Sequence, residues 1–480
     1  MFGKNPKDEK NIHDPAKLGR TGKGIEGTLD EKQKEKLEGE IVKEKAKAKT
    51  KKTAPSPASG EKAQKSVKKD GKKEKFTDKV KRIVKEEIER LKSEHEAEKT
   101  EVKDFYRKKG VVDRPMLIII LVLICFGSVM VFSASYAYAF DKTGDSYYYV
   151  KRQIAFALIG IAIMAVIALF VDYRWIKKLT IPYFAGSAVL LVGVLAMGVA
   201  EGEAVRWLTI GSLTFQPSET MKLGLVLILA WYFSLTEKKV RSENFWRASF
   251  YGTFAPLAIV AAVCVLIALE KHISGTIIMF AIGMIVIFVA GGKFRWFAIA
   301  GGGFIAIVAA IISFTDYATK RLDIWLHPEN YSVQSEVWQT LQGLYAVGSG
   351  GLFGVGLGNS RQKHLFVSQP QNDFIFAIVC EELGMIGALF VVALFIAFVW
   401  RGIVIAKRAP DTFSKLTAIG IVSKVAIQAF LNIAVVTNTI PNTGISLPFF
   451  SYGGTALIIL FLEMGVLLSI SRYSYVENGS

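Results

Sequence analysis

Apolar and polar residues separate into two regions along this chain. Residues 1–73 form a low-complexity tract of Lys, Glu, Ala, Pro, Ser and Gly, which cannot bury enough apolar surface to offset chain entropy and is expected to be disordered. Between Glu74 and about Lys109, apolar residues recur at helical spacing on a charged segment: Phe76, Val80, Ile83, Val84, Ile88 and Leu91. This pattern predicts an amphipathic helix at 74–110 that lies on a membrane or docks a partner, with a transient solvated helix as the alternative.

From residue 115 onward, apolar runs dominate, and many are long enough to cross a bilayer, which takes about 20 residues. They lie near 115–140, 153–171, 181–200, 218–235, 248–268, 274–291, 297–314, 374–400, 416–438 and 455–471. The sequence therefore predicts an all-α polytopic membrane domain at 111–475, with about ten transmembrane helices and a large extracytoplasmic loop between helices 7 and 8.

The charges of the connecting loops predict the orientation of these spans. With a cytoplasmic N-terminus, the inner loops at 172–178, 237–247, 293–295 and 401–415 are all net basic, whereas the outer connections are acidic, balanced or nearly uncharged. Short cytoplasmic loops carry the excess of Lys and Arg. Both termini are therefore expected to be cytoplasmic.

The composition agrees with a membrane body joined to a charged tail. The 480 residues are 51% hydrophobic, yet the net charge is +17, and residues 1–114 hold 34 Lys and Arg against 23 Asp and Glu, or +11 of that total. The surplus is Lys-rich, mixed with acids and poor in aromatics, which favours anionic membrane lipid over nucleic acid as its partner. Cys125, Cys264 and Cys380 lie in apolar runs without metal or disulfide spacing and are interpreted as packing residues.

The predicted outer loop between about 315 and 373 carries the first candidate chemistry. Its glycine-rich run at 348–360 allows a ligand to approach the backbone and its amide donors, although a flexible loop is the alternative. Arg361 and Lys363 supply cations for a diphosphate. Asp373 stands where the loop re-enters the membrane and is a candidate general base.

Two further outer loops carry polar groups. Pro217 suits the first turn of a helix, and Glu219 and Lys222 then share one face of it, either within a site or as a structural ion pair. The loop at 441–454 is apolar but broken by Pro and Gly. It is expected to dip into the bilayer, where irregular backbone must be buried in protein or line a wet cavity.

Two charges fall inside predicted spans. Lys424 lies nine residues from the cytoplasmic end of span nine, and Glu463 lies nine residues from that of span ten, so both sit roughly 13 Å deep. We predict that they pair inside the bundle, with Glu382 as the alternative partner for Lys424 and snorkelling as the alternative to pairing.

Five motifs in order resemble the SEDS family (FtsW, RodA and SpoVE), and the resemblance covers about 115–472. They are Ser133-Ala-Ser135; Arg206-Trp207 with Phe215-Gln-Pro-Ser-Glu219 and Lys222; Tyr345-Ala-Val-Gly-Ser-Gly350; Asp373-Phe-Ile-Phe-Ala377 with Glu381-Glu-Leu-Gly384; and Leu447-Pro-Phe-Phe-Ser-Tyr-Gly-Gly454. Within the family, the segment 356–363 is most similar to the FtsW division branch. Two departures are Glu270-Lys-His272, where many relatives have Pro-Asp, and Gln369, which replaces a carboxylate.

The resemblance implies a peptidoglycan glycosyltransferase that polymerises lipid II at the outer face of the bacterial cytoplasmic membrane. It would act during cell division, at the septum, with Asp373 as the catalytic base. Arg206, Lys222 and Lys363, with Mg²⁺ or Mn²⁺, would neutralise the departing diphosphate, and no metal ligands can be named. The implied substrate-binding residues are Arg206, Trp207, Gln216, Glu219, Lys222, Gln342, Asn359, Ser360, Gln362, Lys363 and Ser451. The implied partners are lipid II, the undecaprenyl-diphosphate-linked glycan, a class B penicillin-binding transpeptidase and divisome proteins. A lipid II flippase and a non-catalytic division scaffold remain alternatives.

The juxtamembrane segment yields a first testable prediction. A peptide of residues 74–110 should bind anionic vesicles and gain helical circular dichroism there, because its basic face acts within a Debye length of about 10 Å at 0.1 M salt. Raising the salt should weaken binding, and neutral vesicles are the control. A spectrum without helical signal on anionic vesicles would contradict the prediction.

Overall fold

A computed structural model of the chain describes residues 110–201, 204–210, 213–270, 272–314, 316–327, 330 and 337–473. Some side chains between 197 and 213 and between 311 and 321 are also outside the description. The predicted disordered tail and all but the last residue of the predicted amphipathic helix lie outside these residues, so both stay predictions.

Within the described residues, eight helices are long and apolar enough to cross a membrane, and two further apolar helices are shorter. The long ones are α4 (Arg114–Thr143), α5 (Tyr148–Phe170), α6 (Tyr173–Met197), α7 (Pro217–Val240), α8 (Phe245–Ser249) continuing through a π-helical turn into α9 (Ala255–Leu269), α14 (Ile375–Lys407), α15 (Thr412–Val436) and α16 (Gly454–Ser471); the shorter ones are α10 (Ile273–Val289) and α11 (Phe294–Phe314). Each predicted span overlaps one of these helices, although the third, predicted at 181–200, begins at Tyr173 and ends at Met197 in the structure. The predicted all-α polytopic fold is confirmed.

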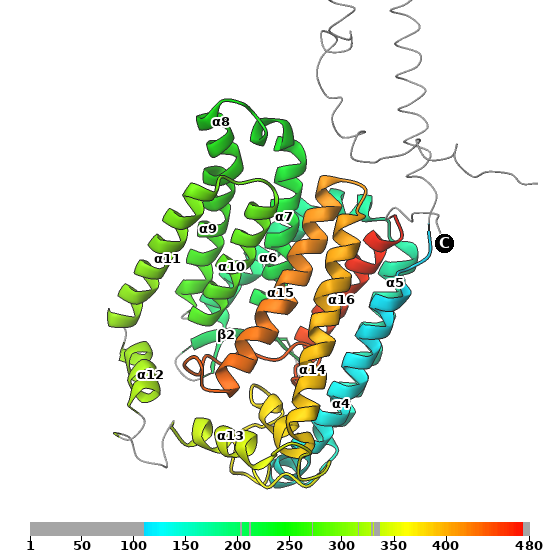
Figure 1. Ribbon diagram of the computed structural model, residues 1–480, viewed down its shortest axis with the longest axis vertical. Coiled ribbons are helices and arrows are strands. Elements are labelled where there is room, and N and C mark those ends of the chain that lie inside the picture. Colours follow the sequence, from blue (N-terminus) through cyan, green and yellow to red (C-terminus); the bar gives the residue numbers. More distant parts are fainter. Residues whose placement is uncertain are drawn as a thin grey trace, which may run out of the picture. The chain divides into compact units, whose positions relative to one another are not determined.

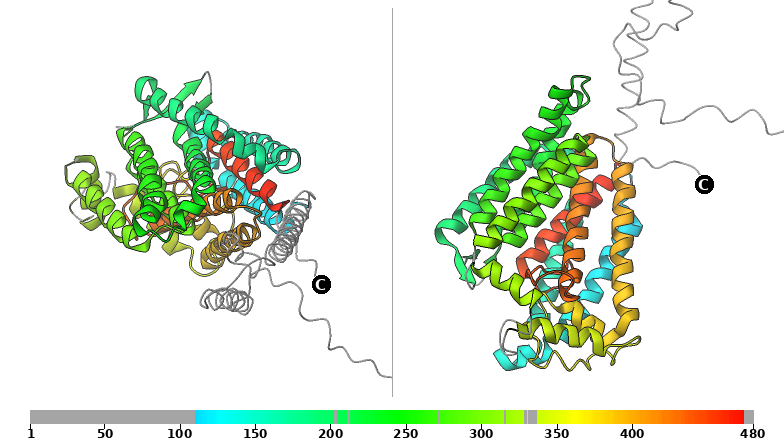
Figure 2. Two further views of the ribbon diagram at one scale, coloured as in Figure 1. Left: turned by 90° about the horizontal axis from the view of Figure 1, so that it is seen from above. Right: turned by 60° about the vertical axis from the view of Figure 1, so that its left-hand side comes forward.

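The helices run side by side, with α15 and α16 between two groups (Figure 1). Helices α7, α9, α10 and α11 gather on one side and α4 and α5 on the other, as the turned views also show (Figure 2). α16 packs along α5, and α15 packs against α7, α10 and α14. The two central helices therefore link the groups.

One end of this bundle is rich in cations, and we call it the basic end. Asp113 caps α4 by accepting from the Met116 amide at 2.9 Å, and its carboxylate pairs with Arg401 of α14 at 2.6 Å. The Gly110 amide donates to the Arg472 carbonyl at 2.9 Å, which ties the start of α4 to the end of α16. The positive-inside rule predicts that the basic end is cytoplasmic.

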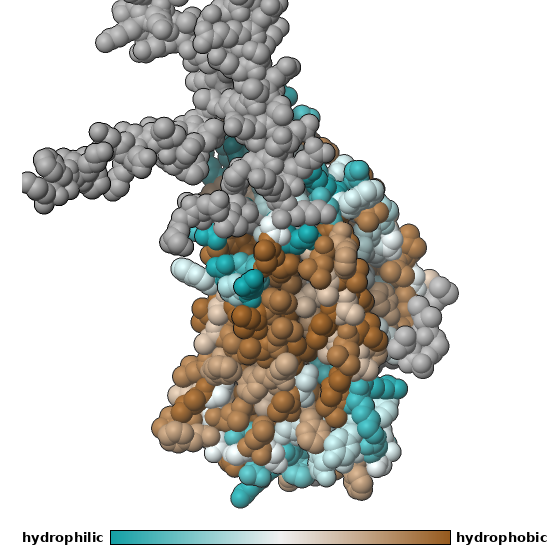
Figure 3. All heavy atoms as spheres, turned by 90° about the vertical axis from the view of Figure 1, so that its right-hand side faces the viewer, coloured by the Kyte–Doolittle hydropathy of each residue, from teal (hydrophilic) through white to brown (hydrophobic). Residues whose placement is uncertain are grey.

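The opposite end carries the long connections, and we call it the loop end. Between the two ends, the face toward α4 and α5 shows a broad apolar band (Figure 3). Its exposed side chains include Ile118, Val129, Leu158 and Val166, each 46% exposed or more. Apolar surface of this extent needs lipid or protein to cover it.

A small sheet at the loop end was not predicted. Strands β1 (Val199–Glu201), β2 (Ala204–Ile210) and β3 (Leu213–Phe215) pair antiparallel in the order β1-β2-β3, with Ala200 opposite Val205 and Thr209 opposite Thr214. Aromatic and β-branched residues in β2 favour strand structure. Two hairpins therefore occupy the connection between α6 and α7.

The glycine-rich loop packs against a break in α14. Helix α14 is interrupted at Gly384, whose φ of 65° is left-handed, and the freed backbone groups pair with the loop. Val355 and Gly356 amides donate to the Glu381 and Glu382 carbonyls at 2.9 and 3.0 Å, and the Met385 amide donates to Gly351 at 2.9 Å. The glycines here permit close backbone contact, which neither sequence interpretation anticipated.

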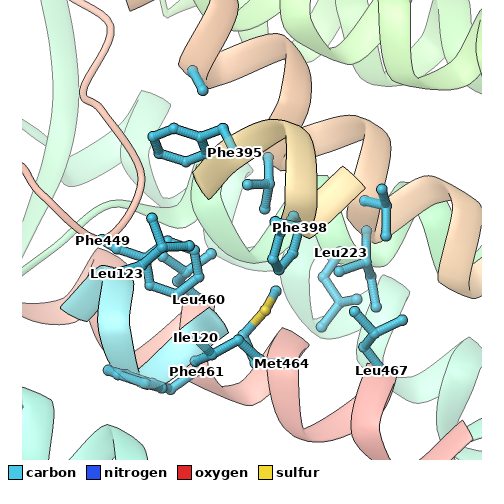
Figure 4. Packing of buried hydrophobic residues seen from close by; sticks show 14 of the residues in the cluster. Ile120, Leu123, Leu223, Phe395, Phe398, Phe449, Leu460, Phe461, Met464 and Leu467 are labelled. Carbon is cyan, nitrogen blue, oxygen red and sulfur yellow. The ribbon is translucent and has the colours of Figure 1, made fainter. Parts of the chain in front are cut away.

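The last loop enters the bundle, as predicted. A Cβ on Gly127 would lie 2.3 Å from the Phe449 carbonyl, and Gly127 is thirteen residues into α4, about 20 Å from the basic end of a layer about 30 Å thick. Phe449 is buried and packs near Phe398 and Phe461, among residues of α4, α14 and α16 (Figure 4). The irregular segment is thus enclosed by protein.

The junction at the α14 break can be tested at Gly354. Its φ is 80°, and an added Cβ would lie 2.2 Å from the Glu382 carbonyl oxygen. Gly354→Ala should therefore lower the free energy of unfolding by about 2 kcal/mol or more in a denaturant titration. Gly348→Ala is the matched control, because a Cβ added to Gly348 would meet no atom within 4 Å, so this variant should change little. Equal effects of both variants would contradict the packing role.

Candidate functional site

Four buried charges meet inside the bundle. Lys424 of α15 donates to both oxygens of Glu463 on α16, at 2.8 and 3.0 Å. Lys424 also lies 3.4 Å from Glu219 of α7, which in turn accepts from Lys222 at 2.5 Å. The predicted Lys424–Glu463 pair and the shared face of Glu219 and Lys222 are both confirmed.

The network is electrically balanced and almost free of solvent. All four side chains are buried, with Glu463 at 0% exposure. A single charge at the centre of a bilayer costs roughly 2.5 to 3.5 kcal/mol on insertion scales, and pairing removes much of that cost. The pairing of these lysines with these glutamates therefore holds α7, α15 and α16 together.

A small cavity of about 40 Å³ opens beside this network. It is lined by Glu219, Lys424 and Gln428, and by residues 446–453 of the last loop with part of α16. A cavity of this size holds a few water molecules, whereas pockets for small molecules measure roughly 300–1,000 Å³. The cavity is therefore too small for a saccharide. A saccharide would bind above the cavity, or inside it only after the overlying loops had moved.

Asp373 lies where the long loop meets the last loop. It is half-buried, and its backbone carbonyl accepts from the Asn432 amide at 2.7 Å. The same amide donates to the Ile445 carbonyl at 2.7 Å, and a Cβ on Gly444 would lie 3.3 Å from the Asp373 carboxylate.

The loop that carries Asp373 is also tied to the cavity wall. The Ser451 hydroxyl donates to the Asn372 carbonyl at 2.8 Å, and the Tyr452 amide donates to Gln371 at 2.8 Å. Ser451 and Tyr452 both line the cavity. The loop that bears the predicted base and the wall of the polar cavity are therefore one hydrogen-bonded unit.

Lys363 belongs to a second polar cluster. Its ammonium donates to Glu382 at 2.9 Å, to the Gly358 carbonyl at 2.6 Å and to the Ser133 hydroxyl at 3.3 Å. Glu382 is thus the partner of Lys363, and the alternative pairing of Glu382 with Lys424 is wrong. All three ammonium hydrogens are used, and the side chain is buried.

Glu381 completes this cluster. It accepts from the buried Ser360 hydroxyl and from the Arg361 amide, the latter at 2.8 Å, and more weakly from the Gln362 amide at 3.4 Å. Ser360 and Lys363 therefore bind the loop to α14 and α4. Their substrate-binding role stays a prediction.

The remaining predicted residues are spread over the loop end. Trp207 is half-buried in β2, and the side chain of Arg206 in that strand is outside the described residues. Gln216 is half-buried at the N-cap of α7, and Gln342 is buried on α13 (Val337–Ser349). Asn359 is exposed and donates to the Val355 carbonyl at 3.2 Å.

The sequence reasoning missed two polar residues of α15. Lys424, Gln428 and Asn432 recur every four residues and so lie on one face of that helix. Polar residues at this spacing in an apolar span indicate a polar site inside the bundle, and this pattern is visible in the sequence.

The described residues offer no dedicated metal site. In that part of the chain, no group of three His, Cys, Asp or Glu residues could hold a metal ion, so the divalent cation stays a prediction. All three cysteines are free; Cys264 and Cys380 are buried as predicted, whereas Cys125 is exposed.

Comparison with known proteins decides the family. The sequence model of the FtsW/RodA/SpoVE family, described as "Cell cycle protein", matches residues 114–476. The chain belongs to this family. The predicted SEDS resemblance is confirmed over the whole membrane body.

Relatives within the family carry both division and sporulation names. Stage V sporulation protein E of Bacillus subtilis is 41% identical over 76% of this chain and 99% of its own length. The probable peptidoglycan glycosyltransferase FtsW of Geobacter sulfurreducens is 35% identical over 75% of this chain and 95% of its own.

Solved structures share the fold of this family member. A chain from a peptidoglycan synthase complex matches with a TM-score of 0.62 at 24% identity, covering 75% of this chain and 98% of its own length. RodA of Thermus thermophilus matches with a TM-score of 0.57 at 23% identity, covering 76% and 98% respectively.

The buried pair can be tested by a double-mutant cycle. Lys424→Met and Glu463→Gln should each lower the thermal unfolding midpoint, because each leaves a charge without its best partner. The double variant should recover much of the loss, with a coupling of about 1–3 kcal/mol in free energy. Strictly additive losses would show that the two side chains do not interact.

Proposed function

We propose that this chain is a peptidoglycan glycosyltransferase that polymerises lipid II at the outer face of the cytoplasmic membrane. The observation that carries the proposal is the position of Asp373. Its backbone carbonyl accepts from Asn432, its carboxylate lies beside Gly444, and the loop that bears it is hydrogen-bonded to the cavity wall at Ser451. Family relatives named probable peptidoglycan glycosyltransferase support the same activity.

The reaction requires one general base at the loop end to accept the proton of the attacking hydroxyl. The 4-hydroxyl of the acceptor sugar attacks the anomeric carbon of the lipid-linked strand, and a new glycosidic C–O bond forms. Asp373 takes the hydroxyl proton, while the bond from the anomeric carbon to the diphosphate breaks and undecaprenyl diphosphate leaves with the electron pair. The half-buried position of Asp373 suits this role, because it is open to substrate on one side.

The leaving group carries charge that must be stabilised. Lys222 and Lys363, proposed from the sequence for this task, are both bound to carboxylates. They can act on a diphosphate only by sharing or exchanging those partners. Arg206 and a divalent cation that binds together with the diphosphate would supply the remaining positive charge in this proposal. No protein ligands are assigned to the metal.

Partners and location follow the same proposal. A solved relative belongs to a peptidoglycan synthase complex that coordinates polymerisation and crosslinking, which supports a class B penicillin-binding transpeptidase as the partner of this chain. The FtsW relatives favour the division septum and divisome proteins, although a sporulation protein is also similar. A fluorescent fusion followed through division and sporulation would separate the two.

A transporter that moves lipid II across the bilayer is the second candidate. The balanced charge network deep in the bundle, beside a polar cavity, would also suit a flippase. Purified protein and labelled lipid II distinguish the two functions, because a flippase makes no glycan.

The central prediction concerns Asp373. Asp373→Asn should reduce polymerisation of labelled lipid II at least about a hundredfold, because the amide cannot accept the proton, while the thermal unfolding midpoint changes little. Asp145→Asn is the control, since Asp145 is an exposed loop-end carboxylate bound to Lys151, and it should keep normal activity. Undiminished glycan synthesis by Asp373→Asn would end the assignment.

A further inference from the structure

The buried lysines near the proposed site are already neutralised, and the inference drawn from this rests on the proposed function. Both substrates of that reaction carry a lipid-linked diphosphate. Yet the lysines of the two polar clusters are each bound to a carboxylate: Lys222 to Glu219, Lys363 to Glu382, and Lys424 to Glu463. A diphosphate needs cations that are not already neutralised.

Arg152, at the loop end of α5, is such a cation. It is exposed, and no carboxylate of the described residues pairs with it. Its neighbour Lys151, by contrast, is bound to Asp145 at 2.8 Å. The first turn of α5 holds no acidic residue, so the positive end of the helix dipole adds to the charge of Arg152.

Aromatic contacts connect Arg152 to the cavity. The guanidinium carbon lies 4.5 Å from the centre of the Tyr148 ring, which favours a defined orientation of the cation. Tyr148 meets Tyr149 edge to face at 5.2 Å, and Tyr149 meets Tyr452 in the same way at 4.9 Å. Tyr452 lines the cavity beside Glu219 and Lys424.

The charge of Arg152 also acts on Tyr452 directly. Burial raises the pKa of the Tyr452 hydroxyl, and the nearby guanidinium opposes that rise. Through the rings of Tyr148 and Tyr149, Arg152 is connected to Tyr452 at the rim of the cavity, and both the guanidinium and the Tyr452 hydroxyl can donate to an anion there.

A buried amide next to Arg152 lacks partners. Gln153 is 0% exposed, and neither its amide nitrogen nor its oxygen bonds to any described residue. It is four residues from Tyr149, so both lie on one face of α5, the face that meets Tyr452. An unbonded buried amide is destabilising, and a polar ligand or water at this face would relieve that cost.

We propose that Arg152, with Tyr148 and Tyr452, binds the diphosphate of a lipid-linked saccharide at the rim of the cavity. The planar guanidinium donates two parallel hydrogen bonds to phosphate oxygens, which fixes the orientation of the ligand as well as adding affinity. Arg152 would then hold one lipid-linked substrate without breaking any buried ion pair. The same contact would hold undecaprenyl diphosphate as product.

The test measures binding as well as turnover. The full chain in phosphatidylcholine nanodiscs is titrated with undecaprenyl diphosphate, and Arg152→Gln should raise the Kd about tenfold. Lys151→Gln is the matched control and should stay within about twofold of the parent chain, because that lysine is already paired. Arg152→Lys should fall between the two, since it keeps charge but loses the bidentate geometry. Equal thermal unfolding midpoints confirm that the variants are folded.

Competition identifies the ligand chemistry. Inorganic diphosphate should compete with undecaprenyl diphosphate on the parent chain and much less on Arg152→Gln. If phosphatidylglycerol competes equally well, Arg152 is a general anionic-lipid contact and the proposal is overturned. Unchanged binding by folded Arg152→Gln would also overturn it. If the parent chain binds undecaprenyl diphosphate through Arg152 but makes no glycan from lipid II, the glycosyltransferase function fails while this site stands.

Discussion

A lysine placed deep in an apolar layer is the constraint on which the centre of this protein depends. Lys424 cannot stay charged there without carboxylates, and it finds two, Glu463 on α16 and Glu219 on α7. Because these three side chains lie on α15, α16 and α7, three helices must keep their register for the charges to balance. Neutralisation of one cation thus fixes the packing of the helices that surround the cavity.

Backbone N–H and C=O groups in the apolar layer of a membrane must also be paired, and this requirement explains the structure of the loop end. Helix α14 is broken at Gly384, yet its freed groups bond to residues 351–356 of the glycine-rich loop. The last loop enters beside Gly127 of α4 and is held by Asn432. Irregular backbone at this depth allows Asp373, Ser451 and Tyr452 to gather above the charges, which continuous helices would not permit.

The sequence predicted the features that depend on a residue's position along an apolar helix. Span positions follow from apolar length, and the Lys424–Glu463 pair follows from equal depth along neighbouring helices. Contacts that depend on loop geometry were not predictable. Lys363 was interpreted as a ligand for diphosphate because it follows glycines, but its partner, Glu382, lies across a helix break that sequence periodicity does not reveal. Arg152 is adjacent to Lys151 in the sequence, and the contact of Lys151 with Asp145 that distinguishes the two cations is set by side-chain direction, which the sequence does not show.

Whether a cation is paired with a carboxylate also distinguishes the structural cations of this fold from the cation proposed to bind ligand. A buried lysine bound to a carboxylate is costly to detach, since the carboxylate left behind loses its compensation. An exposed arginine oriented by an aromatic ring loses little when it exchanges water for phosphate. The protein can therefore keep a rigid, neutral centre through Lys424 and Glu463 and still present positive charge at its rim. Rigidity and anion binding are assigned to different residues, so a diphosphate can arrive and leave without loosening the helices that position Asp373.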